Sequence, residues 1–197
     1  MRERGLAAVG YFYVDFHDHN KQDAPGLLSS LLEQLSTQSD RFFDILSRLR
    51  AKHNRGGERP SEEELAKCLR DMLEHPGQAP VFIVIDALDE CPDSRSPGSP
   101  PGVLTRRQLV LTILKGLIES KLPNLHICLT SRPEFDIQKV LDPFEPISMS
   151  LHTQKGQLDA IAQYVESVVT SHWMMRRWSK TTKKLVIDTL ANKSHGM

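Results

Sequence analysis

The sequence predicts an α/β domain built around a mostly parallel sheet. Two short apolar runs, VFIVID at residues 81–86 and LHICLT at residues 125–130, are continuous rather than alternating, a pattern typical of parallel strands covered on both faces. Segments with the apolar spacing of amphipathic helices lie before, between and after these runs. Strands that alternate with helices in this way favour a parallel sheet.

One further strand and two helices are predicted before the first run. Residues 9–16 (VGYFYVDF) combine aromatic and β-branched side chains, which favours a strand. Pro25 then opens a helix with an apolar face at spacings of three and four, formed by Leu27, Leu28, Leu31, Leu32 and Leu35. Residues 42–49 carry a second amphipathic pattern, which ends at the Asn-Arg-Gly-Gly break of residues 54–57.

Two capping boxes mark the starts of the next helices. Ser61, with Glu64 three residues later, predicts a helix that ends near His75, before a Pro-Gly pair. Thr105 and Gln108 form the same pattern and predict a helix between the two apolar runs. In both cases the two side chains can satisfy backbone N–H groups that the first helical turn leaves without partners.

The remaining segments are a loop, a weaker strand and two helices. Residues 92–102 hold four of the chain's twelve prolines and are expected to form a loop. Residues 144–151 (FEPISMSL) are a weaker strand candidate. Helices are expected near residues 157–172 and 181–193.

The composition excludes several classes of protein. The 197 residues include 25 Lys and Arg and 25 Asp and Glu, so no overall basic field favours nucleic acid or an anionic membrane surface. No apolar run approaches the roughly 20 residues of a membrane-spanning helix. The three cysteines are scattered, which argues against a disulfide framework or a zinc site and favours a reducing compartment. We therefore expect a cytoplasmic protein with no nucleic-acid and no membrane partner.

The candidate chemistry lies where the two apolar runs end, since ligands bind at the carboxyl ends of parallel strands. Asp86 ends the first run and is followed by Asp89 and Glu90. This is the Walker B arrangement, in which the strand-end carboxylate orients the Mg²⁺ shell and a following acid polarises the attacking water. Arg132, after the second run, could stabilise negative charge on the γ-phosphate.

Each motif also has an ordinary structural explanation. The segment DALDE at residues 86–90, taken alone, is as consistent with a solvated acidic turn as with a Walker B segment. Arg132 could form a structural ion pair with Glu134 or Asp136. The two motifs together, in this order and at this separation, favour the nucleotide site.

The combined motifs resemble the NACHT class of STAND P-loop NTPases, in particular its expanded fungal set. The resemblance rests on VFIVIDALDEC followed by LHICLTSRPE, and it extends to GYFYVDFHDHNKQD with LLSSLLEQLS, to KGQLDAIAQYVESVV and to LVIDTLANKSHGM. It implies a three-layer α/β/α fold with a mostly parallel sheet. It also implies an incomplete NTPase core over residues 1–152 and the start of the following helical region over residues 153–197.

The resemblance implies roles for the acidic residues. Asp86 would be the Walker B aspartate that holds Mg²⁺ when nucleotide is bound. Asp89 and Glu90 would be the acidic pair typical of this class, with Glu90 as the preferred activator of water.

The second strand end has implied roles as well. Arg132 would be the sensor-1 arginine facing the γ-phosphate, and Thr130 and Ser131 would shape the strand tip. In complete relatives Mg-ATP and Mg-ADP switch an oligomerisation scaffold, which implies other protein domains as partners, including homotypic NACHT contacts.

The phosphate-binding loop of such an NTPase does not occur in this sequence. None of the eleven glycines is followed by lysine, so there is no GxxxxGK[ST] motif. In the family that loop precedes the segment at residues 9–16, so the resemblance implies that the first strand and its loop are missing and that both ends are cut. We expect the chain to be marginally stable alone and to bind ATP poorly, because acidic strand ends without a phosphate-binding cation repel ATP.

Three functions stay open at this point. The chain is either a fragment of a NACHT-type signalling NTPase, a nucleotide-free module that binds other proteins, or a working AAA-like ATPase whose P-loop lies outside the sequence. The sequence leaves enzymatic activity undecided.

Some further features have two interpretations each. Trp173, Met174, Met175 and Trp178 are interleaved with basic residues and could bind nucleic acid or a partner domain; we favour a helix–turn–helix junction with a packed tryptophan and solvated lysines. The segment with His17 and His19 is more readily explained as a polar strand end than as a metal site. Cys91 is expected to be an inert thiol, since no cationic neighbour is evident.

Overall fold

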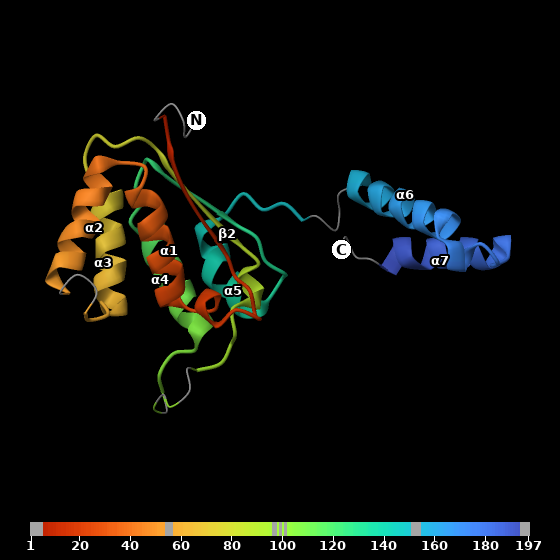
Figure 1. Ribbon diagram of the computed structural model, residues 1–197, viewed down its shortest axis with the longest axis horizontal. Coiled ribbons are helices and arrows are strands. Elements are labelled where there is room, and N and C mark those ends of the chain that lie inside the picture. The colour runs from red at the N-terminus through yellow and green to blue at the C-terminus, as the bar shows by residue number, and fades with distance from the viewer. Residues whose placement is uncertain are drawn as a thin grey trace. The chain divides into compact units, whose positions relative to one another are not determined.

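The computed structural model describes residues 6–53, 57–95, 98, 100, 102–150 and 155–193 (Figure 1). The chain folds as two units, Met1–Glu145 and Pro146–Met197. The first unit contains the sheet and the second contains a pair of helices.

Three parallel strands form the sheet of the first unit. β1 (Ala8–Tyr13), β2 (Val81–Asp86) and β3 (Leu125–Leu129) lie in the order β1-β2-β3. Tyr13 is in register with Asp86, so the carboxyl ends of β1 and β2 meet at the same edge of the sheet. The predicted parallel sheet is confirmed, although β1 ends at Tyr13 rather than at residue 16.

The predicted helices are present and lie together on one side of the sheet. They are α1 (Ala24–Ser36), α2 (Asp40–Lys52), α3 (Glu62–Leu73) and α4 (Arg106–Glu119), as Figure 1 shows, and the short α5 (Phe135–Leu141) packs against α4. The centre of this layer is the leucine face of α1, whose members are at most 1% exposed, namely Leu27, Leu28, Leu31, Leu32 and Leu35.

Both predicted capping boxes are confirmed. The Glu64 N–H donates to Ser61 Oγ at 3.3 Å and the Ser61 N–H donates to Glu64 Oε2 at 3.0 Å. The corresponding bonds between Thr105 and Gln108 are 3.2 and 2.9 Å long. The starts of α3 and α4 are therefore fixed locally, by residues three positions apart in sequence.

The outer edge of β1 is closed by one side chain of α1 and one from the segment that follows it. Gln38 accepts the Val9 N–H at 3.0 Å and donates to the Val9 carbonyl at 2.8 Å. Gln34 makes the same pair of bonds with Tyr11, at 3.1 and 2.7 Å. This close approach requires Gly10, where an added Cβ would lie 2.9 Å from a methyl group of Leu31. The two amides occupy the position of a neighbouring strand, so the sheet ends at β1.

The second face of the sheet is exposed within the described part of the chain. Tyr11, Tyr13 and Phe82 are 45%, 57% and 36% exposed, and His126 stacks on Phe82 with ring centroids 4.6 Å apart. The prediction that β2 is covered on both faces is therefore wrong for the described residues. The physical reason is that right-handed crossovers made in one direction along a sheet place their helices on the same side. This architecture is consistent with part of a three-layer α/β/α fold.

The weaker strand candidate at residues 144–151 is not a strand where it is described. A 3-10 turn, η4 (Asp142–Phe144), is followed by residues 146–150 without regular structure, and Ile147 and Met149 are exposed. Pro143 and Pro146 lack backbone N–H donors, which disfavours pairing in a sheet. Residue 151 lies outside the described residues, as do residues 54–56 of the expected break after α2.

The second unit consists of α6 (Lys155–Ser171), the 3-10 turn η6 (Trp173–Met175) and α7 (Lys180–Lys193). Both predicted helices are confirmed. Trp173 and Trp178 are 72% and 38% exposed, so the expectation of a packed tryptophan at this junction is wrong. Both residues lie in the connection between α6 and α7 rather than in either helix. Among the described residues, no helix combines the length and apolar character needed to cross a bilayer.

Candidate functional site

The ends of β2 and β3 are joined through side chains. The Thr130 hydroxyl donates to the Asp86 carboxylate and accepts the Ala87 N–H at 2.9 Å. The backbones continue this pairing, since the Thr130 N–H donates to the Ile85 carbonyl and the Leu88 N–H donates to the Thr130 carbonyl, both at 2.9 Å. The predicted residues Asp86 and Thr130 are therefore joined by a hydrogen bond.

Ala87 has a left-handed backbone conformation, with φ 54° and ψ 48°. This conformation costs a non-glycine residue roughly 1–2 kcal/mol, and such strain is concentrated at functional sites. It reverses the chain into η3 (Leu88–Glu90), and the fully buried Leu88 anchors that turn in the core. As a result, Asp89 and Glu90 return to the strand ends rather than extending into solvent.

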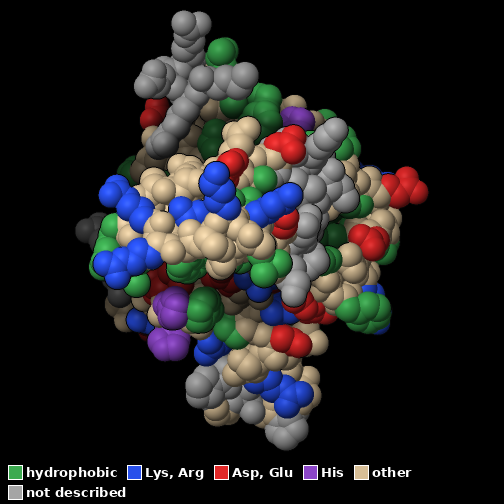
Figure 2. Space-filling view, turned by 90° about the vertical axis from the view of Figure 1, so that its right-hand side faces the viewer, with side chains coloured by type: hydrophobic (Ala, Val, Ile, Leu, Met, Phe, Trp, Pro, Cys, Tyr) green, Lys and Arg blue, Asp and Glu red, His purple; other side chains and the backbone are tan. Residues whose placement is uncertain are grey.

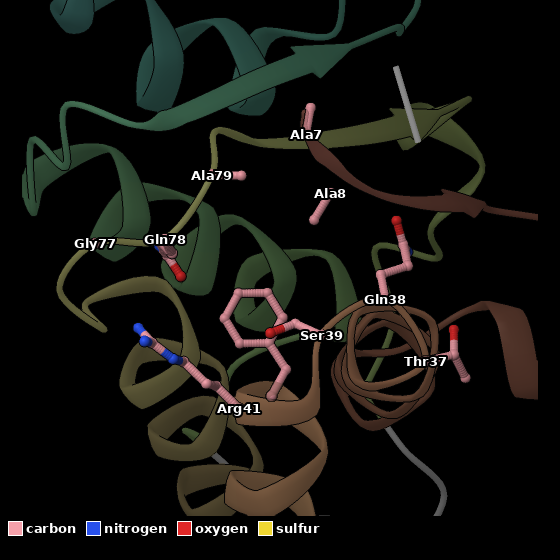
Figure 3. Close-up of a pocket in the computed structure, with 10 residues that line it drawn as sticks. Ala7, Ala8, Thr37, Gln38, Ser39, Arg41, Gly77, Gln78 and Ala79 are labelled. Atoms are coloured by element: carbon pink, nitrogen blue, oxygen red, sulfur yellow. The ribbon is translucent and has the colours of Figure 1, made fainter. Parts of the chain in front are cut away.

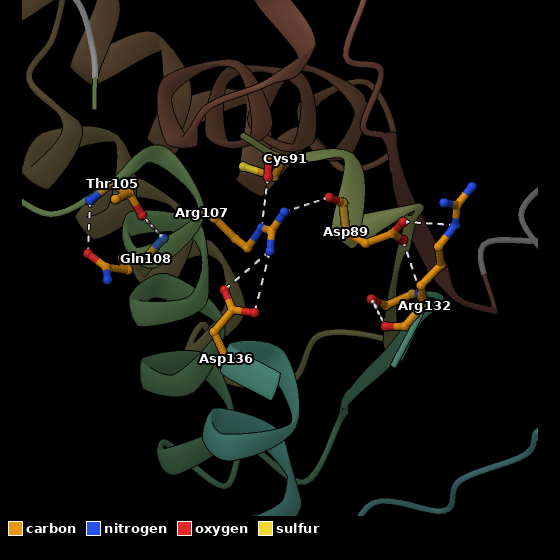
Figure 4. Close-up of polar contacts among 8 residues, drawn as sticks. Asp89, Cys91, Thr105, Arg107, Gln108, Arg132 and Asp136 are labelled. Atoms are coloured by element: carbon orange, nitrogen blue, oxygen red, sulfur yellow. Dashed lines mark hydrogen bonds and ion pairs between the residues drawn. The ribbon is translucent and has the colours of Figure 1, made fainter. Parts of the chain in front are cut away.

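Asp89 and Arg132 form the second connection between the two strand ends (Figure 4). The Arg132 N–H donates to Asp89 Oδ1 at 3.0 Å, and Arg132 Nε lies 3.5 Å from Oδ2. The Asp89 side chain is only 12% exposed, whereas that of Arg132 is 69% exposed, and the outer nitrogens of its guanidinium point away from Asp89 in Figure 4. The ion-pair partner is therefore Asp89, and not Glu134 or Asp136 as the structural explanation proposed.

The other two predicted residues make weaker connections. Glu90 accepts the Phe16 N–H at 3.5 Å, which links η3 to the segment after β1. The Ser131 hydroxyl donates to the carbonyl of its neighbour Arg132 at 2.7 Å. Glu90 thus contacts the segment after β1, while Ser131 stabilises only the local turn.

Arg107 is a site residue that the sequence analysis missed. Its guanidinium donates to the carbonyls of Cys91 and Asp89, both at 2.8 Å, and lies 3.4 Å from the Asp136 carboxylate (Figure 4). These two carbonyls flank Glu90, so Arg107 fixes the acidic turn to α4 and α5. The sequence contained a signal for this role, because Arg107 lies in the first turn of the predicted helix. An arginine there interacts unfavourably with the helix dipole and requires a compensating partner.

Cys91 is buried directly behind the acidic turn. It is 1% exposed, its thiol donates to the Gln22 carbonyl at 3.1 Å, and burial raises its pKa to about 12. Arg107 and Arg106 act in the opposite direction, so the expected lack of a cationic neighbour is wrong. Burial outweighs them, and the thiolate is disfavoured, as expected of an inert thiol.

The sequence comparison assigns a family to this arrangement. Residues 1–132 match the family described as nephrocystin 3, N-terminal. The chain belongs to this family. The matched segment of the nephrocystin 3 N-terminal region includes all three strands and ends at Arg132, so it contains every predicted site residue. No curated protein and no solved structure matches the chain.

Asp86 is the residue of this nephrocystin 3 N-terminal region that could hold a magnesium ion shared with a phosphate ligand. Mg²⁺ uses one or two protein carboxylates and completes its shell with phosphate and water. Asp86 supplies such a carboxylate at the end of β2. Within the described ranges, no group of three or more His, Cys, Asp or Glu is arranged so that it could hold a metal ion.

A hollow of the nephrocystin 3 N-terminal region lies at the opposite end of the sheet (Figure 3). It has a volume of about 640 Å³ and is lined by residues before β1 and β2 and around the start of α2, including Ala7, Gln38, Arg41 and Gln78. Gln38 is already bonded to Val9, and Arg41 donates to the Pro76 carbonyl at 3.3 Å. This hollow is separate from the acidic strand ends and has no comparable set of charged groups.

Proposed function

We propose that the chain is part of a NACHT-type signalling NTPase of the STAND class, in which nucleotide state controls association with other protein domains. The single observation that carries this proposal is the pairing of Asp86 with Thr130 and of Asp89 with Arg132 across adjacent parallel strands. This pairing gathers carboxylates and an arginine at the edge of the sheet where α/β proteins bind ligands.

The geometry supports a separate role for each residue. Asp86 would hold Mg²⁺, which neutralises charge on the phosphates. Glu90 is the candidate to orient and activate water, and the exposed guanidinium of Arg132 is available to the γ-phosphate. Asp89 acts through Arg132, because both of its carboxylate oxygens face the backbone N–H or Nε of that residue.

The edges of the sheet also support the proposal. The outer edge of β1 is closed by Gln34 and Gln38, whereas within the described residues β3 pairs only with β2. The resemblance implies a further strand beside the sensor strand, which corresponds to β3. The proposed cellular setting is the cytoplasm, and the proposed nucleotide is Mg-ATP or Mg-ADP.

Nucleotide binding by the 197-residue chain tests the phosphate-loop argument. Titration with a fluorescent ATP analogue and Mg²⁺ is expected to give no binding tighter than about 1 mM. Asp86→Asn and the exposed-loop control Asp93→Asn should behave like the parent chain. Tight binding that Asp86→Asn abolishes and Asp93→Asn retains would overturn the weak-binding expectation.

The transcript upstream of Met1 tests the NTPase assignment. If it encodes GxxxxGK[ST] in frame, the longer protein is expected to hydrolyse ATP. Glu90→Gln should then lower kcat by roughly a hundredfold or more, the usual contribution of a general base, while Asp93→Asn leaves kcat unchanged. Equal kcat for both variants refutes the role of Glu90.

A nucleotide-free interaction module is the second candidate, favoured by the exposed aromatic face of Tyr11, Tyr13 and Phe82. A transcript that starts at Met1, together with concentration-dependent association weakened by Tyr13→Ser, would support this candidate over the NTPase.

A further inference from the structure

The turn between α6 and α7 exposes large apolar side chains. Trp173, Met174 and Trp178 are 72%, 61% and 38% exposed. We call residues 172–184 the basic tip, because the apolar side chains alternate there with Lys and Arg. Figure 2 shows Lys and Arg side chains gathered on the face that is turned to the viewer.

The basic tip concentrates positive charge in a chain whose net charge is zero. Residues 167–187 contain no Asp or Glu, and they include the basic residues Arg176, Arg177, Lys180, Lys183 and Lys184. Throughout the described ranges, none of these five cations forms an ion pair. This positive charge is therefore available to an anionic partner. It is not evident from the net charge of the whole chain, which is zero.

We propose that the basic tip docks on the surface of a membrane that contains anionic lipid. Indole rings favour the boundary between headgroups and acyl chains, and Lys and Arg favour the lipid phosphates. Clustered basic residues next to apolar side chains are a typical feature of peripheral binding to anionic lipid. This proposal revises the expectation of no membrane partner, which rested on the balanced overall charge and on the lack of a long apolar run. It concerns docking on a membrane surface rather than a spanning helix.

Two other kinds of partner fit the basic tip less well. Interfaces between proteins are depleted in lysine, whereas three of the five cations here are lysines. Single-stranded nucleic acid binds through aromatic platforms on which successive bases stack, and Met174, adjacent to Trp173, has no aromatic ring. An apolar side chain exposed on a turn is instead suited to insertion between lipid headgroups.

Tryptophan fluorescence reports selectively on the surroundings of the basic tip, since Trp173 and Trp178 are the only tryptophans of the chain. The 197-residue protein is expected to emit like a solvent-exposed indole in buffer. Vesicles of phosphatidylcholine with about 30% phosphatidylserine should shift the emission to the blue and sediment the protein, whereas pure phosphatidylcholine vesicles should do neither. Added salt should reverse the binding, because it screens the attraction.

Matched variants localise the effect. Neutralising one cation near an anionic surface lowers the affinity about fivefold, so Lys180→Gln with Lys184→Gln should lower it roughly 25-fold. Lys115→Gln with Lys139→Gln removes the same charge from exposed positions on α4 and α5 and should change it less than twofold. Circular dichroism checks that both double variants keep the helical content expected of the parent chain.

Several results overturn the proposal. One is a lack of blue shift with the phosphatidylserine vesicles, and another is equal loss of affinity in both double variants. Emission already blue-shifted in buffer would show that protein covers the tip. A larger blue shift with oligouridylate than with vesicles would identify nucleic acid as the preferred partner.

Discussion

Replacing Arg107 by methionine tests whether the acidic turn is held by this one side chain. The Arg107 side chain is 12% exposed, and the substitution keeps most of its apolar stem and removes the guanidinium. Two charged hydrogen bonds of 2.8 Å to the carbonyls of Asp89 and Cys91 are lost. Hydrogen bonds to charged groups contribute roughly 1.5–3 kcal/mol each, and the partly exposed Asp136 pair adds less than about 1 kcal/mol. We expect the free energy of unfolding of the first unit to fall by about 4 kcal/mol.

Urea unfolding and thiol labelling together measure this loss. Arg95→Met is the matched control, because Arg95 also donates through Nε to a backbone carbonyl at 2.8 Å but is exposed. We expect it to cost less than about 0.5 kcal/mol. Arg107→Met also removes the hydrogen bond to the Cys91 carbonyl. The segment around Cys91 should then open more often, so that its thiol is labelled faster. Equal stability of the two variants, with unchanged labelling of Cys91, would refute the reasoning.

Other predictions concern the strained residue, the buried thiol and the closed edge of β1. Ala87→Gly is expected to raise the free energy of unfolding by about 0.5–1 kcal/mol, because glycine relieves the left-handed strain, whereas Ala51→Gly in α2 should lower it by about 1 kcal/mol; urea unfolding measures both. For Cys91, burial raises the pKa from 9.0 to about 12, so the folded state retains a proton that the unfolded state loses. Stability from this thiol is complete below pH 9 and declines as the pH rises toward 12, and Cys91→Ala should reduce the slope of stability against pH in this range by up to about 1.4 kcal/mol per pH unit. Gln34→Ala and Gln38→Ala should each cost about 1 kcal/mol in urea unfolding, and the double variant should associate through the opened strand edge in sedimentation experiments.

Each of these predictions has a clear contrary result. A loss of stability in Ala87→Gly would mean that the left-handed conformation carries little strain. An unchanged alkaline slope in Cys91→Ala would mean that the thiol titrates normally in the folded chain. A monomeric Gln34→Ala/Gln38→Ala variant would mean that the two amides do not protect the edge of β1.

The secondary structure was largely predictable because its signals are local. The apolar runs gave β2 and β3, the leucine spacing gave α1, and the capping boxes of Ser61 and Thr105 gave the starts of α3 and α4. The prediction at residues 144–151 was wrong because a short apolar segment becomes a strand only when an edge is available to pair with it, and this depends on tertiary structure.

The sequence by itself determined the class of fold, the order of its elements and the positions of Asp86, Asp89, Glu90 and Arg132 at strand ends. Only the tertiary structure decided that Asp89 is the partner of Arg132 and that Arg107 holds the acidic turn. It also decided which face of the sheet stays exposed in the described residues. The physical reason is range: helix caps and apolar periodicity act over a few neighbouring residues, whereas these partners are separated by 43 and 18 positions in the chain and meet only after folding.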